Sequence, residues 1–487
     1  LSAAAKIALR SGRSRIELTQ RYSSSDRKRL QLLEGRGVNP AWVLVAAILG
    51  SAMTFIDSTA VNVSLPVIQH ELHTTTGQTQ WVIEGYALFL SALILPGGAL
   101  GDIYGRKLIF GVGIVIFALA SLACAFANDI TLLIVARCVQ GIGGALSTPG
   151  SLSLISAAYD EQERGRAIGL WSGFSSLTSA AGPVIGGWLT ESFSWRYVFV
   201  INVPLAVAVL LILALRVPES RDESSDRKVD VIGAALATVG LGLLVFGLID
   251  LNGGRVSAWA VGSAVAGLAA LVAFVLFERH TPDPMLRADL FASRTFSVAN
   301  VYTFLLYAAI GGSLYFVPFV LINVHHYSPA QAGAALLPFI FIMVVLSRWS
   351  GGLVTRIGPR TPLLFGSILA GLGFLAYALP GTDGSYWTTF FPAATILGLG
   401  GALFVAPLTT TVMDSVGVEH SGVASGVNNA VARTAGLIGV AALGVVVTVA
   451  SSYLAGFRGA MIASALLAFA ASAVAALGFA PPRAARS

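Results

Sequence analysis

Three ionisable residues of this sequence, Asp57, Glu84 and Arg137, stand inside long apolar stretches. A charge in the middle of a bilayer costs about 2.5–3.5 kcal/mol on insertion scales, so a charge that is kept there is a functional candidate. The helical rise of 1.5 Å per residue places Asp57 and Arg137 roughly 10 Å from the outer membrane face and Glu84 roughly 6 Å from it. The matching depth makes an Asp57–Arg137 salt bridge feasible and predicts a cluster of all three groups in the outer half of the membrane.

Such a cluster could couple protons to transport. If Asp57 and Arg137 separate as a cavity opens and closes, Asp57 could bind a proton from outside and release it inside. The proton gradient would then be the energy source, with no cofactor and no metal. Two structural interpretations stand beside this one. The pair could hold two helices together permanently, and Glu84 could face a polar vestibule near the outer surface.

The composition indicates that these stretches cross a membrane. Of the 487 residues, 55% are hydrophobic and only 11% are charged, whereas soluble domains carry roughly 25% charged residues. A membrane-spanning helix needs about 20 apolar residues. The sequence therefore predicts an all-α integral membrane protein with fourteen spans, near 42–65, 80–100, 108–127, 131–156, 166–190, 197–216, 230–250, 257–277, 296–322, 331–353, 361–380, 388–413, 422–449 and 457–480.

The basic residues of the loops predict the orientation, because cytoplasmic loops carry an excess of Lys and Arg. Alternate loops are rich in both, and the remaining loops hold only Arg196, Arg255 and Arg458. We therefore expect a multi-pass protein of the cell membrane with both termini in the cytoplasm. In a cell with two membranes, this would be the inner membrane. The first forty residues are polar and basic without an apolar core, so no cleavable signal peptide is expected.

Charged loops divide the spans into groups of six, two and six. Parallel six-helix halves of this kind form transporters with a substrate cavity between the halves, and the extra pair would lie outside that core. The predicted divisions are a basic cytoplasmic segment at 1–41, a half at 42–216, a loop at 217–229, the extra pair at 230–277, a loop at 278–295, a second half at 296–480 and a cytoplasmic tail at 481–487.

The segment Gly98–Lys107 reads GALGDIYGRK and joins two predicted spans. It resembles motif A of the major facilitator superfamily, a loop that latches the two halves together on the cytoplasmic side. A turn this short needs glycine for its backbone geometry. The resemblance implies a cytoplasmic gate, although a positive-inside turn with solvated charges would use the same residues: Gly98, Asp102, Gly105, Arg106 and Lys107. Ile103 stands where a basic residue is common, and the second half has Thr355 in place of the Asp.

Further segments resemble the fourteen-spanner drug–proton antiporters of that superfamily. Asp57–Pro66 (DSTAVNVSLP) is similar to their first-helix signature, Arg137 opens RCVQGIGG, which resembles motif B, and Trp195–Pro204 (WRYVFVINVP) is typical of the entry to their sixth helix. The resemblance covers nearly the whole chain from about residue 42. It implies a major facilitator fold of two six-helix halves plus two extra central helices, and drug efflux by proton antiport.

Gly182–Gly187 (GPVIGG) is similar to the antiporter motif C of these proteins. Upstream, Gly169 fits that motif, but Thr178 stands where a glycine is expected. Pro183 cannot donate its backbone hydrogen bond and bends a helix, and Gly182 and Gly186 lie on one face and permit close packing. A kinked, closely packed helix could seal the cavity against proton leak, and ordinary glycine packing is the alternative.

The predicted cavity has polar and aromatic candidates for contact with substrate. Asn429 and Arg433 stand four residues apart on one helical face, and tyrosines interrupt an apolar run of the ninth span. These side chains could contact substrate, or they could equally satisfy one another between helices. The full set is Tyr86, Trp171, Tyr302, Tyr307, Asn428, Asn429 and Arg433.

No motif of an enzyme is present: the sequence holds no HExxH, no GxSxG, no Walker loop and no clustered histidines. We therefore expect neither an enzyme nor an ATP-driven pump. The expected partners are a small-molecule substrate, protons and membrane lipid, with no nucleic acid, and the expected state is a monomer. Export of a lipid or an endogenous metabolite by the same mechanism is an alternative, and so is a membrane sensor or scaffold that transports nothing.

Overall fold

The computed structural model describes residues 39–221, 230–251, 257–281, 284, 288–350, 352–381, 385–416 and 421–479. The basic segment predicted at 1–41 falls almost wholly outside these residues, as does the tail at 481–487. Every regular element within them is helical. The helices are α4 (Pro40–Glu71), α5 (Thr76–Tyr104), α6 (Arg106–Ala125), α7 (Ile130–Ala158), α8 (Glu161–Ser192), α9 (Tyr197–Val200), α10 (Asn202–Arg216), α11 (Val231–Leu251), α12 (Ala258–Glu278), η1 (Ala288–Ala292), α13 (Arg294–Asn323), α14 (Pro329–Ala334), α15 (Leu337–Ser350), α16 (Leu353–Ile357), α17 (Arg360–Ala378), α18 (Phe390–Asp414), α19 (Ser421–Val449) and α20 (Tyr453–Gly478).

Thirteen spans among the described residues are long and apolar enough to cross a membrane. The fourteenth predicted span, 166–190, also forms a helix, α8, but its charged first turns and its many serines make it less apolar than the rest. Two spans are broken: α9 and α10 share one, and α14 and α15 share another.

Several helices begin earlier than the apolar runs suggest, and polar caps set the first turns of α5 and α7. Asp129 accepts from the backbone N–H of Leu132 at 2.9 Å, and Thr75 forms a capping box with Gln78 at the start of α5. Such caps satisfy backbone N–H groups that have no partner inside the helix.

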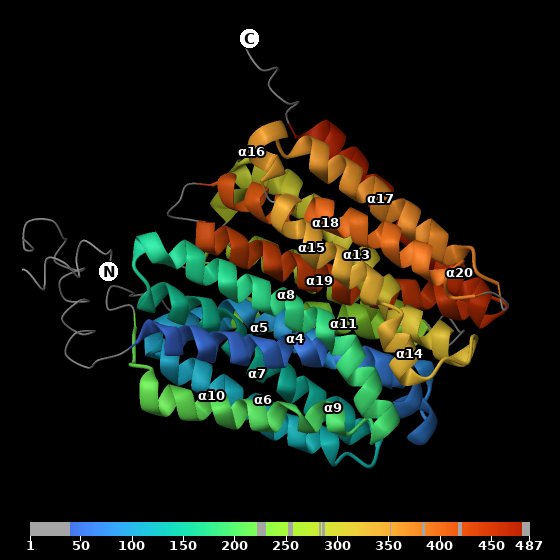
Figure 1. Ribbon diagram of the computed structural model, residues 1–487, viewed down its shortest axis with the longest axis horizontal. Coiled ribbons are helices and arrows are strands. Elements are labelled where there is room, and N and C mark those ends of the chain that lie inside the picture. Colours follow the sequence, from blue (N-terminus) through green and yellow to red (C-terminus); the bar gives the residue numbers. More distant parts are fainter. Residues whose placement is uncertain are drawn as a thin grey trace, which may run out of the picture.

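The helices from α4 to α10 form one half and those from α13 to α20 form the other (Figure 1). The extra pair joins them on one side: α12 packs on α11, which in turn packs on α5 and α19. Trp81 of α5 meets Phe246 of α11, with ring centroids 6.5 Å apart. The outer face of α12 exposes large apolar side chains such as Trp259, which is 81% exposed, as expected of a lipid-facing helix.

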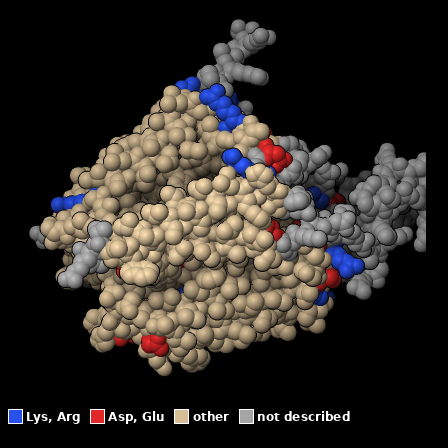
Figure 2. Space-filling model, turned by 180° about the vertical axis from the view of Figure 1, so that it is seen from behind, with Lys and Arg blue, Asp and Glu red and all other residues tan. Residues whose placement is uncertain are grey.

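Charge is absent from most of the surface that Figure 2 shows, and most of the visible Lys and Arg gather at the end where the described chain begins. The halves touch at the opposite end, where α8 packs on α14. Figure 1 shows the two halves spreading apart toward the basic end. The arrangement leaves the middle of the molecule as the place where both halves can contribute to one site.

Candidate functional site

Asp57 and Arg137 form a fully buried ion pair. Arg137 of α7 donates through Nη1 to Asp57 Oδ2 of α4 at 2.5 Å, and neither side chain is exposed. Arg137 Nε also donates to the Val82 carbonyl of α5 at 2.9 Å. The aromatic ring of Tyr86 covers the guanidinium, with 4.3 Å from Cζ to the ring centroid, a cation–π contact. The predicted pair is therefore a junction of three helices.

Three further side chains complete this pair. Gln140 Nε2 donates to Asp57 Oδ1 at 2.9 Å, and Asn202 Nδ2 of α10 donates to the same oxygen at 3.1 Å. Both amides also reach Ser121 Oγ of α6, at 2.8 and 3.3 Å. We name these five residues, Asp57, Ser121, Arg137, Gln140 and Asn202, the aspartate network. Both oxygens of Asp57 have donors, so its charge is compensated in full.

Sequence reasoning did not single out Gln140, Asn202 and Ser121. The first two stand inside the segments that carried the resemblance, RCVQGIGG and WRYVFVINVP. A signal was present, because polar residues inside apolar spans need partners there. Gln140 lies three residues after Arg137 and so on the same face of α7.

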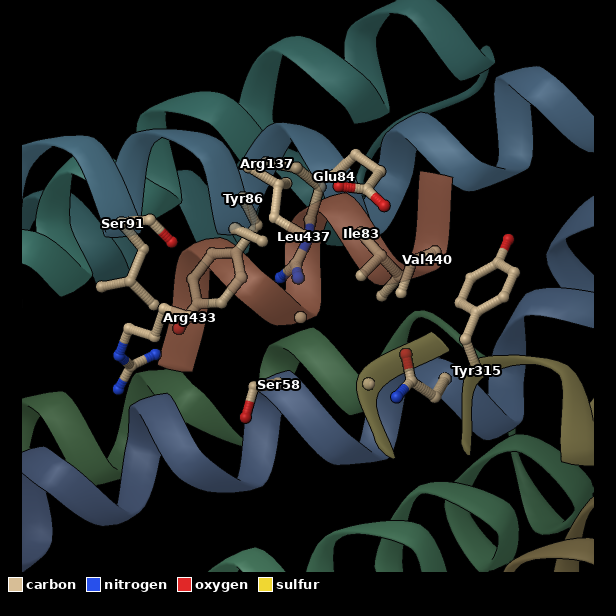
Figure 3. Close-up of a pocket in the computed structure, with 15 residues that line it drawn as sticks. Ser58, Ile83, Glu84, Tyr86, Ser91, Arg137, Tyr315, Arg433, Leu437 and Val440 are labelled. Atoms are coloured by element: carbon tan, nitrogen blue, oxygen red, sulfur yellow. The ribbon is translucent and has the colours of Figure 1, made fainter. Parts of the chain in front are cut away.

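A cavity of about 180 Å³ lies between the two halves, beside the aspartate network. Residues of α4, α5 and α7 from the first half and residues of α13 and α19 from the second half line it (Figure 3). Arg137 reaches the wall, but Asp57 does not. The lining consists of Ser58, Asn62, Ile83, Glu84, Tyr86, Ala87, Leu90, Ser91, Arg137, Gly311, Tyr315, Arg433, Gly436, Leu437 and Val440.

Glu84 lines this cavity apart from the ion pair. Its side chain is fully buried, and neither carboxylate oxygen has a hydrogen-bond partner among the described residues. Arg137 Nη2 and the Tyr315 hydroxyl in the same wall also have no such partner. In Figure 3 the Glu84 carboxylate and the Arg137 guanidinium point in different directions. The predicted three-residue cluster is therefore a pair plus a separate carboxylate, because equal depth does not bring side chains to the same face of a helix.

Arg433 of α19 enters the same cavity from the second half. Its side chain is half-buried, and it makes no hydrogen bond or ion pair within the described part of the chain. Figure 3 shows its guanidinium at the end of the pocket away from Glu84, with the Tyr86 ring between them. The wall thus carries one acidic and one basic side chain, each without a partner among the described residues.

The other predicted cavity residues lie elsewhere. Tyr302 donates to the Leu363 carbonyl of α17 at 2.8 Å, and Trp171 donates to Ser51 Oγ at 2.9 Å. Asn428 binds Asn300 and Thr303 of α13 at 3.1 and 2.8 Å. The last two of the set are a partly buried Tyr307 and an exposed Asn429. None of these five is in the wall of the cavity in this conformation.

The glycine-rich loop between α5 and α6 is held by charge. Asp102 accepts from Arg106 at 2.9 Å, and Gly105 has a φ of 122°, which favours glycine. Glu219, which follows α10, accepts from the backbone N–H groups of Lys107 and Leu108 at 2.9 and 3.1 Å. A carboxylate at a helix N-terminus is stabilising, so in this conformation the loop is tied to its own half. Gly98, also of this motif, lies against Pro149 of α7.

The GPVIGG segment of α8 lies where the halves touch. An added Cβ on Gly186 would press on Ala60 of α4, in the same half, and one on Gly187 would press on Pro329 of α14, in the other half. The Pro183 carbonyl meets Gly333 of α14 in the same way. Glu191 accepts from the Ala330 N–H at 3.0 Å beside this contact.

The other end of α8 is open. Added Cβ atoms on Gly169 and Gly173 would meet nothing within 4 Å. Phe174 is 48% exposed. Gly182 packs against Thr59 of α4, so these glycines are packed closely toward the outer end of α8 and face open space toward its inner end.

Comparison with known proteins places this geometry in context. The family described as Major Facilitator Superfamily matches residues 47–440. The chain is 35% identical over 405 residues to the multidrug resistance protein Stp of Mycobacterium tuberculosis (strain CDC 1551 / Oshkosh), across 82% of this chain and 74% of that protein. It is 33% identical over 419 residues to the tetracenomycin C resistance and export protein of Streptomyces glaucescens, across 85% and 76%. It is 35% identical over 421 residues to the methylenomycin A resistance protein of Bacillus subtilis (strain 168), across 85% and 89%.

Solved structures share the fold. A bacterial homologue of the human lysosomal transporter Spinster, in an inward-facing and unoccupied conformation, matches with a TM-score of 0.65. The match covers 90% of this chain and 96% of that one at 18% identity. At 18% sequence identity this similarity supports the fold alone.

Proposed function

The chain belongs to the Major Facilitator Superfamily, and on that premise we propose that it exports small amphipathic or cationic molecules in exchange for protons. It is a multi-pass membrane transporter and not an enzyme. Its relatives bear the names of antibiotic resistance and export proteins. The proposed energy source is the proton gradient, without a cofactor.

The observation that carries the proposal is the unpartnered Glu84 carboxylate in a cavity beside the compensated Asp57–Arg137 pair. A buried carboxylate without donors must take up a proton or a cation, since an isolated charge in an apolar site is costly. Glu84 can therefore exchange one for the other. The free Nη2 of Arg137 links this cavity to Asp57, so a change in the cavity can reach the ion pair.

The contacts of α8 support a mechanism of alternating access. Gly187 and Pro183 pack on α14 at the outer end, which supports a role as a seal against proton leak. The inner end of α8 is open at Gly169 and Gly173. We propose that the halves rock about the cavity, that the Gly98–Lys107 loop closes the inner side in the opposite state, and that the protein acts as a monomer.

The orientation belongs to the same proposal. Basic loops and both termini lie on the cytoplasmic side, in line with the Lys and Arg at one end of Figure 2. The halves at 42–216 and 296–480 would move, and the pair at 230–277 would remain outside the transport core.

Purified protein in liposomes with an imposed pH gradient provides the test. Uptake is measured for a panel of cationic, neutral and anionic compounds, with Asp57→Asn and Glu84→Gln beside the parent protein. We expect gradient-driven flux in the parent and its loss in both variants. Asp414→Asn, which changes an exposed carboxylate at the inner end of α18, is the matched control. Gradient-independent behaviour of every compound in the parent, or unchanged coupling in both variants, would exclude the proposal.

A further inference from the structure

The cavity between the halves holds two opposite charges, Glu84 and Arg433, that lack an ion-pair or hydrogen-bond partner among the described residues. The third charged residue of the wall, Arg137, is compensated by Asp57. An unpaired charge in an apolar setting is costly, and pairing it with an opposite charge is the usual remedy. The two groups therefore specify what a ligand must bring.

The helices that carry these two charges run antiparallel along the cavity. Near the outer end, Gln80 Nε2 of α5 donates to the Val440 carbonyl of α19 at 3.0 Å. Further in, an added Cβ on Gly426 of α19 would lie 3.9 Å from Leu95 of α5. Between these two contacts the helices stay side by side, so positions on one can be matched in height to positions on the other.

Glu84 and Arg433 point away from each other along this axis. Helical side chains lean toward the N-terminus of their own helix, so Glu84 leans toward the outer end and Arg433 toward the inner end. The matched heights differ by about one turn, and with the reach of both side chains the charges lie on the order of 10 Å apart. Figure 3 shows the two groups at opposite ends of the pocket, with Tyr315 on the Glu84 side and Ser91 nearer Arg433.

Much of the cavity lining is apolar and aromatic, and it includes Ile83, Tyr86, Leu90, Leu437 and Val440. Tyr86 and Leu437 lie between the two charged groups (Figure 3). Such a surface suits a flat hydrophobic body, because ligand sites combine apolar walls with a few placed polar groups. Each end has a further polar atom without a partner, the Tyr315 hydroxyl at one and Ser91 Oγ at the other.

We infer that this cavity binds dipolar amphipathic molecules, with a protonated amine on Glu84, a carboxylate or similar anion on Arg433 and an apolar body across Tyr86. The two charges of the ligand must stand on the order of 10 Å apart, which excludes simple α-amino acids. The inference rests on the proposed function, since it takes this cavity to be the substrate site.

Three compounds with one ring system test it. Norfloxacin carries a piperazine amine and a carboxylate at opposite ends of a fused aromatic ring; its ethyl ester keeps the amine alone, and N-acetyl norfloxacin keeps the acid alone. Binding is measured by fluorescence on protein in lipid nanodiscs without a gradient. We expect norfloxacin to bind most tightly, with each derivative weaker by roughly tenfold or more, the effect of losing a hydrogen bond to a charged group.

Two variants assign the ends. Glu84→Gln should remove the preference for norfloxacin over the N-acetyl compound, and Arg433→Gln should remove the preference over the ester. Asp414→Asn and Arg166→Gln, which change exposed charges outside the cavity, should keep the parent ranking. Equal affinity for the three compounds, absence of binding by all three, or the same loss for all three in both cavity variants would overturn the dipolar site.

Gradient-driven flux of the same compounds separates this inference from the proposed function. The expected ranking in nanodiscs without any flux in proteoliposomes would overturn export and leave the dipolar site standing. Flux of all three compounds at equal rates would overturn the dipolar site and leave export standing.

Discussion

Two buried carboxylates in the same half of the molecule have opposite surroundings. Asp57 accepts from Arg137, Gln140 and Asn202 and is fully compensated, whereas Glu84 has no donor on either oxygen among the described residues. Both are 0% exposed. Burial of a charge inside a membrane therefore does not by itself say what the charge does; its partners decide that.

The two sites also differ in which parts of the molecule build them. The aspartate network draws on α4, α6, α7 and α10, all in the first half. The cavity with Glu84 needs α13 and α19 of the second half as well. When two halves move against each other, bonds inside one half persist while a site between them changes shape. We therefore expect the aspartate network to change less between conformations than the cavity.

The largest expected effect on stability comes from breaking the aspartate network. Arg137→Met leaves Asp57 buried without its counter-charge, and removal of one partner of a buried pair costs about 3–5 kcal/mol. We expect a much lower yield and a strongly lowered thermal midpoint in detergent. Arg433→Met, the same change at the unpaired arginine of the cavity, is the control and should leave the midpoint near that of the parent. Equal losses for the two variants would contradict the comparison.

The spans and the pairing of Asp57 with Arg137 could be predicted from the sequence. Span positions follow from runs of apolar residues, and the Asp57–Arg137 pair follows from depth, which needs only the rise of a helix. The ends of the helices were harder to predict, because capping residues such as Asp129 lie outside the apolar runs.

The sequence did not show in which direction each side chain points around its helix axis. Depth arithmetic put Glu84 with Asp57 and Arg137, but the carboxylate faces the other half. Tyr302 was predicted to line the cavity and instead bonds to α17. Which face of a span meets which neighbour depends on the packing of two halves far apart in sequence, and apolar periodicity is weak where lipid and protein interior are equally apolar.

Two neighbouring glycines of α8 test the same difference between contacts within one half and contacts between the halves. The expected effect on stability is of intermediate size. Gly186 packs on Ala60 within the first half, and Gly187 packs on Pro329 of the second. Overpacking costs about 1–3 kcal/mol. Gly186→Leu should lower the thermal midpoint, because both residues of its contact belong to the first half. Gly187→Leu should lower it less and instead open the outer contact.

Outer opening is measured by a cysteine in the cavity wall. Ser58→Cys is labelled with a membrane-impermeant thiol reagent in intact cells, and we expect faster labelling in the presence of Gly187→Leu. Gly173→Leu, where nothing lies within 4 Å of an added Cβ, controls for the size of leucine, and protein without the new cysteine controls for the native thiols. Faster labelling by Gly186→Leu than by Gly187→Leu would reverse the assignment.

The smallest effect on stability should come from Glu84→Gln. The amide keeps the shape of the side chain and replaces a carboxyl group that has no partner to lose, so the thermal midpoint should stay near that of the parent. Asp57→Asn is the same chemical change in the aspartate network, and it leaves Arg137 uncompensated, so its thermal midpoint should fall as far as that of Arg137→Met. A fall for Glu84→Gln that matches Asp57→Asn would mean that Glu84 has a counter-charge, and the two carboxylates would then be alike. The expected result is an unchanged midpoint together with lost proton-driven flux. It would mean that Glu84 matters for transport and not for stability, because a carboxyl group without a partner in one conformation can gain one in another.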